Sequence, residues 1–199
     1  MSYPIPAAQA RAEIEIKKSR FIAYACGIES REQGQQWLES LKAQYPDARH
    51  HCWAYLLGDP QYAVSAGMGD DGEPSGTAGK PILNVLQHKG VGDIMLVVVR
   101  YFGGIKLGAG GLTRAYGQAA QAVMAQLLIE ERVAQKRLLI SCDFAQEQLL
   151  RHWCQQVEGG VEQVHYHQQV EMGLQIPVKH LPAFLAQLES VSCFYQLLE

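Results

Sequence analysis

Two glycine-rich segments hold the residue types in this chain that could do chemistry. The first, DDGEPSGTAGKP at positions 70–81, combines three carboxylates, two hydroxyls and one ammonium group: Asp70, Asp71, Glu73, Ser75, Thr77 and Lys80. A tight glycine-rich connection accounts for this composition without any ligand. Alternatively, the hydroxyls and the free N–H groups at the start of a helix would bind a phosphate or carboxylate, or the three carboxylates would hold magnesium.

The first segment matches none of three familiar motifs. A phosphate-binding P-loop fails because Pro74 and Pro81 stand where its first glycine and its final hydroxyl are needed. The GxGxxG pattern at 67–72 is accidental, because a dinucleotide pyrophosphate would face two carboxylates and no helix begins after it. Ser75 does not have the spacing of a nucleophile elbow. What remains is a short acidic turn with Ser75 or Thr77 as the predicted helix cap.

The second segment, VVVRYFGGIKLGAGGLTR at positions 97–114, leads from an apolar strand through a glycine-rich loop into a helix. Glycines let a ligand approach the backbone, and a helix N-terminus favours an anion. Cations interleaved with aromatic side chains suit single-stranded nucleic acid. Close packing between strand and helix explains the same residues equally well. The candidate binding residues are Arg100, Tyr101, Phe102, Gly103, Gly104, Lys106, Gly108, Gly110, Gly111 and Arg114.

Metal and nucleophile chemistry find little support. The sequences His50-His51-Cys52 and His165-Tyr166-His167 each offer possible ligands, but no third and fourth ligand follows at a recognisable zinc spacing. No serine or cysteine stands beside a dedicated base. We therefore predict no metal, no cofactor and no identifiable catalytic residue.

Composition excludes several classes of protein. The 199 residues include 17 Lys and Arg against 20 Asp and Glu, a formal charge of −3, with 48% hydrophobic and 19% charged residues. These values fit a globular protein and exclude a disordered chain or a polycation. No apolar run suits a membrane span, no secretory signal is recognisable, and the 5 cysteines are scattered. We expect a cytoplasmic protein with reduced thiols.

Periodicity in the first part of the chain predicts mixed elements. Strands are expected around 14–16 and 21–26, at 94–99, and as a hairpin of 51–57 with 61–66. Helices are expected from Ser30 to Tyr45, at 82–87 and at 112–128. Basic residues concentrate at 80–114, a stretch with five basic residues and a single acidic one, Asp93.

The last 70 or so residues repeat strand and helix patterns in a different order. Strands at 138–144, 161–166, 170–176 and 193–198 alternate with helices at 146–157 and after Pro182. The order β-α-β-β-α-β is that of a ferredoxin-like domain. We predict an α+β protein with domains at 1–130 and 131–199.

A family resemblance joins the two segments. DDGEPSGTAGKPIL and VVVRYFGGIKLGAGGLTRAY together resemble the paired signature of the IMPACT family, and KSRFIA and HHCWAY extend the match over about residues 15–125. The resemblance implies a first domain like the second domain of small-subunit ribosomal protein five, and a ferredoxin-like second domain similar to those of elongation factor G. Eukaryotic relatives are linked to translational control through a ribosome-associated activator of a stress kinase.

The sequence thus favours a cytoplasmic binding protein associated with translation, which contacts RNA or a ribosome-associated partner through the glycine-rich basic surface. We expect the two segments to form one pocket in which Arg100, Lys106, Lys80 and Arg114 meet a phosphate, bordered by the three carboxylates. Two alternatives remain open. One is an enzyme acting on a small phosphorylated or acidic metabolite between these acids and cations, and the other is a protein–protein adaptor that uses the acidic second domain.

Overall fold

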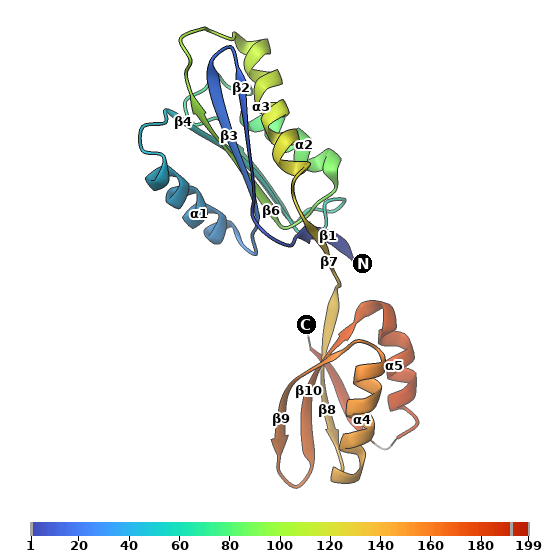
Figure 1. The fold of residues 1–199 in the computed structure, drawn as a ribbon. Coiled ribbons are helices and arrows are strands. Elements are labelled where there is room, and N and C mark those ends of the chain that lie inside the picture. The colour runs from blue at the N-terminus through green and yellow to red at the C-terminus, as the bar shows by residue number, and fades with distance from the viewer. Residues whose placement is uncertain (1, 192, 199) are drawn as a thin grey trace. The chain divides into compact units, whose positions relative to one another are not determined.

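The computed structural model describes residues 2–191 and 193–198. They form two compact units, one spanning Tyr3–Arg132 and the other beginning at Val133, with which Ser2 is grouped. Both units contain helices and sheets, so the α+β prediction is confirmed (Figure 1). No helix among these residues is long and apolar enough to cross a membrane.

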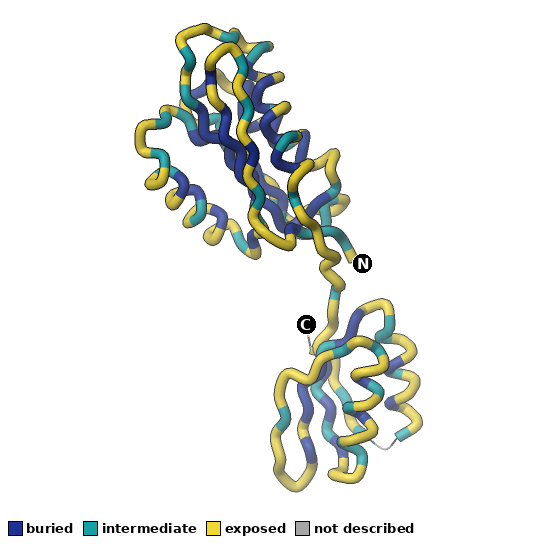
Figure 2. The backbone as a smooth tube through the Cα atoms, in the orientation of Figure 1, coloured by how far each residue is buried: buried dark blue, intermediate teal, exposed yellow. Residues whose placement is uncertain are grey.

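The first unit is built on a five-stranded antiparallel sheet in the order β2-β3-β6-β4-β5. Its central strand β6 (Ile94–Tyr101) is the apolar run of the sequence, and it is buried along nearly its whole length (Figure 2). A strand covered on both faces needs apolar side chains on both, which explains why the run does not alternate. The other strands are β2 (Ala10–Ile16), β3 (Ser19–Gly27), β4 (His50–Leu57) and β5 (Ser65–Gly69).

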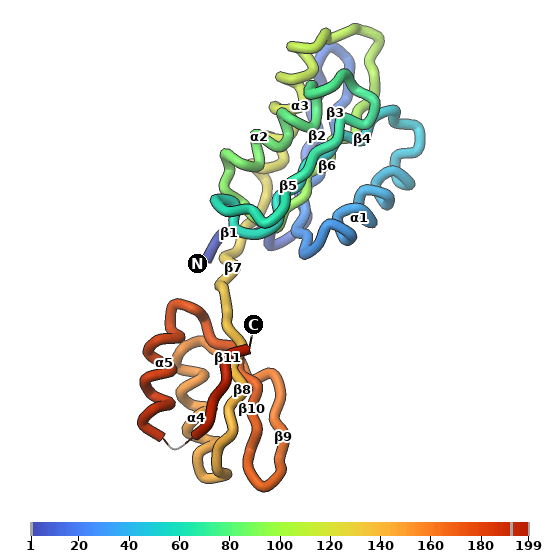
Figure 3. The backbone as a smooth tube through the Cα atoms, turned by 180° about the vertical axis from the view of Figure 1, so that it is seen from behind, coloured from blue at the N-terminus to red at the C-terminus, as the bar shows by residue number. Residues whose placement is uncertain are grey.

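Three helices cover this sheet, one on one face and two on the other (Figures 1 and 3). Helix α1 (Arg31–Gln44) begins at Ser30, whose hydroxyl accepts a hydrogen bond from the Gln33 backbone as predicted. Helices α2 (Gly79–Lys89) and α3 (Ala109–Met124) enclose the larger apolar core on the opposite face. Each face of β6 therefore has a core of its own.

A pair of short strands closes the first unit. Strand β1 (Tyr3–Pro6) pairs antiparallel with β7 (Ile129–Arg132). The carboxylate of Asp93 accepts hydrogen bonds from the Tyr3 hydroxyl, the Gly58 amide and the Arg132 guanidinium, each at 2.7 Å. The predicted helix at 112–128 ends earlier, at Met124, because the chain must turn to bring 129–132 beside β1.

The second unit has the predicted ferredoxin-like connectivity. Its four-stranded antiparallel sheet has the order β11-β8-β10-β9, and an apolar core is packed between this sheet and its two helices. Helix α4 starts at an Asp143–Gln146 capping box, two residues before its predicted start. The elements are β8 (Gln135–Cys142), α4 (Phe144–Gln156), β9 (Gly160–Tyr166), β10 (Val170–Pro177), a 3-10 turn (Val178–His180), α5 (Leu181–Leu188) and β11 (Phe194–Leu198).

Candidate functional site

The two glycine-rich segments lie side by side in the first unit and line one open hollow of about 370 Å³. The start of β4 completes its wall. We call this hollow the β6–α3 groove, because it lies where strand β6 leads into helix α3. Its lining residues are Arg49, His50, Glu73, Pro74, Arg100, Phe102, Lys106, Leu107, Gly108, Ala109 and Leu112.

A buried ion pair forms the base of the groove. The Glu73 carboxylate accepts a hydrogen bond of 2.6 Å from Nη1 of Arg100 and one of 2.8 Å from the hydroxyl of Tyr116. The Arg100 guanidinium also lies 5.5 Å from the centre of the Phe21 ring and 5.8 Å from that of Phe102. Arg100 lines the groove but is neutralised by Glu73 inside the protein, so its contact with a phosphate stays a prediction.

Exposed cations and an aromatic ring make up the rim. Arg49 and Lys106 are exposed, and neither forms an ion pair with any described residue. Phe102 lines the same groove and is 54% exposed. Cations beside an exposed ring can bind a phosphate and stack a base at once.

His50 is held in a fixed orientation at the same rim. Its Nδ1 donates a hydrogen bond of 2.8 Å to the carbonyl oxygen of Asp71. A carbonyl can only accept, so Nε2 of the neutral ring carries no proton, and it lies 3.9 Å from Glu73 Oε1. The neutral imidazole therefore presents a hydrogen-bond acceptor at the rim.

Asp70 occupies the helix N-terminus that was predicted to bind a ligand. Its carboxylate accepts hydrogen bonds from the amides of Gly76, Ala78 and Gly79 at 2.8–3.0 Å. Burial alone would raise the pKa of Asp70, but these three N–H groups outweigh it and lower the pKa below its usual range. These amides already donate to an internal anion, so they are not the free N–H groups from which phosphate binding was predicted.

Thr77 and Asp71 of the first segment also have structural partners. Ala78, not Ser75 or Thr77, is the N-cap residue of α2, and the Thr77 hydroxyl donates instead to the Pro74 carbonyl at 2.6 Å. Asp71 accepts a hydrogen bond of 2.6 Å from the His51 amide. The three carboxylates thus face separate partners, and no cluster of His, Cys, Asp and Glu within 2–191 and 193–198 is arranged to hold a metal ion.

Three further candidates lie away from the groove. Lys80 is exposed on α2 and lines none of the hollows described for the chain. Tyr101 packs toward the α1 side of the sheet, with the Arg20 guanidinium 5.6 Å from its ring centre. Arg114 lines a second hollow of about 240 Å³ with Ile16, Lys17, Leu107, Gly111, Ala115 and Gln118, which we call the hairpin hollow. The single predicted pocket is therefore two neighbouring hollows, without Lys80.

Packing explains part of the glycine content of the second segment. A Cβ on Gly103 would lie 2.0 Å from the carbonyl of Lys18, and one on Gly111 would lie 3.0 Å from Leu107. Gly104 and Gly108 adopt φ values of +87° and +72°, which disfavour other residues. Gly110 has only the Arg114 side chain near it, at 3.8 Å, so its position is open.

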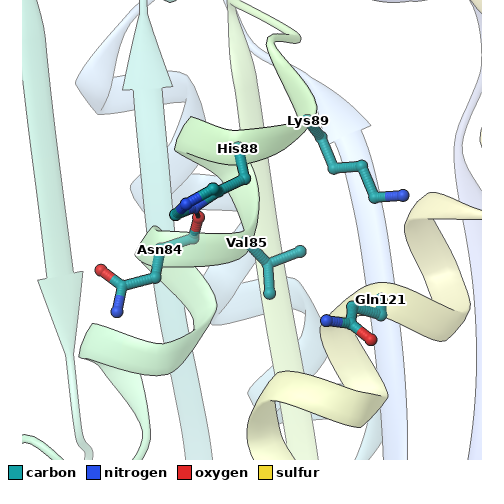
Figure 4. A pocket seen from close by; sticks show the side chains of 5 residues that line it. All are labelled: Asn84, Val85, His88, Lys89 and Gln121. Carbon is teal, nitrogen blue, oxygen red and sulfur yellow. Dashed lines mark hydrogen bonds between the residues drawn. The ribbon is translucent and has the colours of Figure 1, made fainter.

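Sequence patterns did not single out Arg49 or Lys17 as binding residues. Both lie outside the glycine-rich segments, and only the sheet brings them beside the second segment. A further hollow of about 380 Å³ lies between α2 and α3 and contains none of the predicted residues (Figure 4). Its histidine, His88, bonds the carbonyl of Asn84 on its own helix.

Comparison with known proteins places this architecture in a family. Residues 17–124 match the Impact N-terminal domain, and residues 140–192 match a domain of unknown function (DUF1949). The chain belongs to the IMPACT family. All lining residues of the β6–α3 groove of this IMPACT protein fall inside the first match.

Relatives match this IMPACT protein over both units. An IMPACT family member of Haemophilus influenzae is 39% identical over 96% of this chain and 92% of its own length. The IMPACT family member YigZ of Escherichia coli K12 is also 39% identical, covering 96% of this chain and 94% of its own. A crystal structure of a hypothetical protein aligns with 37% identity and a TM-score of 0.76, covering 100% of this chain and 98% of that one.

Proposed function

We propose that this protein binds single-stranded RNA through the β6–α3 groove, in the cytoplasm, in a role connected with translation. The observation that supports RNA is the rim of the groove: two exposed, unpaired cations, Arg49 and Lys106, together with the exposed ring of Phe102. Phosphates need cations that are free to pair, and bases need an accessible aromatic face.

Charge within the groove supports selective binding. Glu73 and Arg100 cancel each other in its base, so the net positive charge comes from the rim alone. Two rim cations are too few to retain any polyanion by counterion release. Stacking of bases on Phe102 must contribute the remaining binding free energy, which favours unpaired bases over a duplex.

The connection with translation rests on family membership. The resemblance implies translational control for eukaryotic members, and this chain belongs to the same family. A ribosome-associated protein would be the alternative partner, but the exposed cations and the phenylalanine suit a nucleic acid more directly.

Fluorescence anisotropy with a labelled oligouridylate of about ten nucleotides, titrated at several salt concentrations, tests the proposal. Lys106→Ala and Arg49→Ala should each weaken binding and reduce the slope of log K against log salt by about 0.7. Phe102→Ala should weaken binding by about 5- to 150-fold with the salt slope unchanged, since stacking is worth roughly 1–3 kcal/mol per base.

Lys80→Ala is the matched control, because it removes an exposed cation of the same unit that lies outside the groove. Its binding should equal that of the wild type. Equal losses of affinity in Lys80→Ala and Lys106→Ala would show that RNA is attracted by charge without a specific site. No binding of RNA by the wild type would refute the proposal. A thermal shift with a small phosphorylated compound but not with RNA would favour the enzyme, and a nuclease-resistant protein partner would favour the adaptor.

A further inference from the structure

The turn between β2 and β3 consists of two lysines in a conformation that lysine rarely adopts. Ile16 pairs with Ser19, so Lys17 and Lys18 are the whole turn, and their φ values are +48° and +65°. Two-residue hairpin turns with two positive φ values favour Asn-Gly, because a Cβ there lies too close to the following carbonyl oxygen unless a short polar side chain compensates by hydrogen bonding. Such strain concentrates at functional sites, where another requirement maintains it.

Backbone packing fixes this turn against the glycine-rich loop. Gly103 approaches the Lys18 carbonyl so closely that a Cβ would lie 2.0 Å from it. The Gly103 amide also donates a hydrogen bond of 3.2 Å to the Ser19 hydroxyl. The two lysines are therefore held at the edge of the loop that lines the β6–α3 groove.

One side chain stands between the two hollows. Leu107 lines both the β6–α3 groove and the hairpin hollow, and it rests on Gly111, whose added Cβ would lie 3.0 Å away. Lys106 lines the groove on one side of Leu107, while Lys17 and Arg114 line the hairpin hollow on the other. No carboxylate lines the hairpin hollow, and neither of its cations forms an ion pair with a described residue.

We propose that the hairpin hollow is a second phosphate subsite, and that the ligand is a polynucleotide strand whose backbone crosses Leu107 rather than a mononucleotide. This subsite rests on the proposed function of the groove, since it extends the same strand. Cations in both hollows beside a glycine-rich loop suit a phosphate backbone, because each phosphate needs its own cation and close access to the protein. A mononucleotide confined to the groove would contact neither Lys17 nor Arg114, because both line the other hollow.

Length dependence of binding tests the second subsite. Affinities are measured for uridine monophosphate, for a dinucleotide and for an oligouridylate of about ten nucleotides. Lys17→Ala and Arg114→Ala should each weaken binding of the long strand several-fold and reduce its salt slope by about 0.7, while leaving uridine monophosphate unaffected. Lys106→Ala should weaken binding of all three ligands, and Lys80→Ala should weaken none of them.

The outcomes separate the two proposals. Loss of binding in Lys106→Ala but wild-type affinity for the long strand in both Lys17→Ala and Arg114→Ala overturns the second subsite and leaves the groove standing. Wild-type affinity in all of these variants overturns both. Circular dichroism of Lys17→Ala and Arg114→Ala, which change exposed side chains, verifies that each is folded.

Discussion

Replacing Glu73 by alanine should destabilise the first unit more than any substitution on its surface. The Glu73 side chain is only 4% exposed, and its carboxylate is the one described hydrogen-bond partner of the equally buried Arg100 guanidinium. Nε of Arg100 already lacks a partner among the described residues. Removing one member of a buried pair costs about 3–5 kcal/mol, because the remaining charge stays buried.

The Tyr116 hydroxyl adds to that cost. It is buried and donates to the same Glu73 oxygen, so truncation leaves one bond fewer for it. An unsatisfied buried hydroxyl costs about 1–3 kcal/mol, but Cys52 lies 3.3 Å away as a weak alternative partner, so the increment should be at the low end. We expect Glu73→Ala to lose about 4–6 kcal/mol in all, a large fraction of the stability of an ordinary domain.

Urea unfolding followed by tryptophan fluorescence measures this loss. Trp37 and Trp53 report on the first unit, and a Trp153→Phe background removes the signal of the second. Glu39→Ala, which breaks an exposed pair with Lys42, should cost no more than about 0.5 kcal/mol. The double variant Glu73→Ala/Arg100→Met should lose at least about 2 kcal/mol less than the sum of its single variants. A cost below about 1 kcal/mol for Glu73→Ala would refute the buried pair.

Three further predictions concern the backbone and the Asp93 cluster. Gly103→Ala should destabilise the first unit by about 1–3 kcal/mol, because its Cβ would overlap the Lys18 carbonyl. Gly104→Ala has open space around it and should cost about 1 kcal/mol for its positive φ. The urea unfolding midpoints of the two variants measure this difference. Replacing Lys17-Lys18 by Asn-Gly should raise stability by about 1 kcal/mol yet weaken binding of the long oligouridylate, and wild-type binding would contradict it. Burial and the hydrogen bond to Asp93 raise the pKa of Tyr3 to about 12, so above pH 10 the folded state keeps a proton that the unfolded state loses. The free energy of unfolding should therefore fall as pH rises from about 10 to about 12. Tyr3→Phe should show a smaller fall in its urea midpoint over the same pH range.

Local patterns were sufficient to predict most of the fold. The apolar run at 94–99 predicts a doubly covered strand, because a strand between two cores has no polar face. Strict alternation in 170–176 predicts a strand covered on one face, which β10 is. Strands β1 and β7 could not be predicted, since each has four residues and their pairing joins opposite ends of the unit.

The candidate site was predictable in its location but not in its pairings. Glycine content identified the loop, yet the partner of each charge depends on the folded sheet. Asp70 lies eight residues before the N-cap residue Ala78, well outside the spacing of a capping box, so no local pattern reveals it as the cap. Arg100 and Glu73 are 27 positions apart, and their mutual neutralisation follows only from the fold.

The Asp93 carboxylate ties together the first and last strands of the first unit. One carboxylate binds Tyr3 from β1, Arg132 from β7 and the amide that follows β4, so the chain enters and leaves this unit at a single anchored point. Neither end can fray alone, because peeling away β1 also strips β7 of its partner. Amide protons in these two strands should therefore exchange with solvent at a common rate, as one cooperative opening rather than two independent ones.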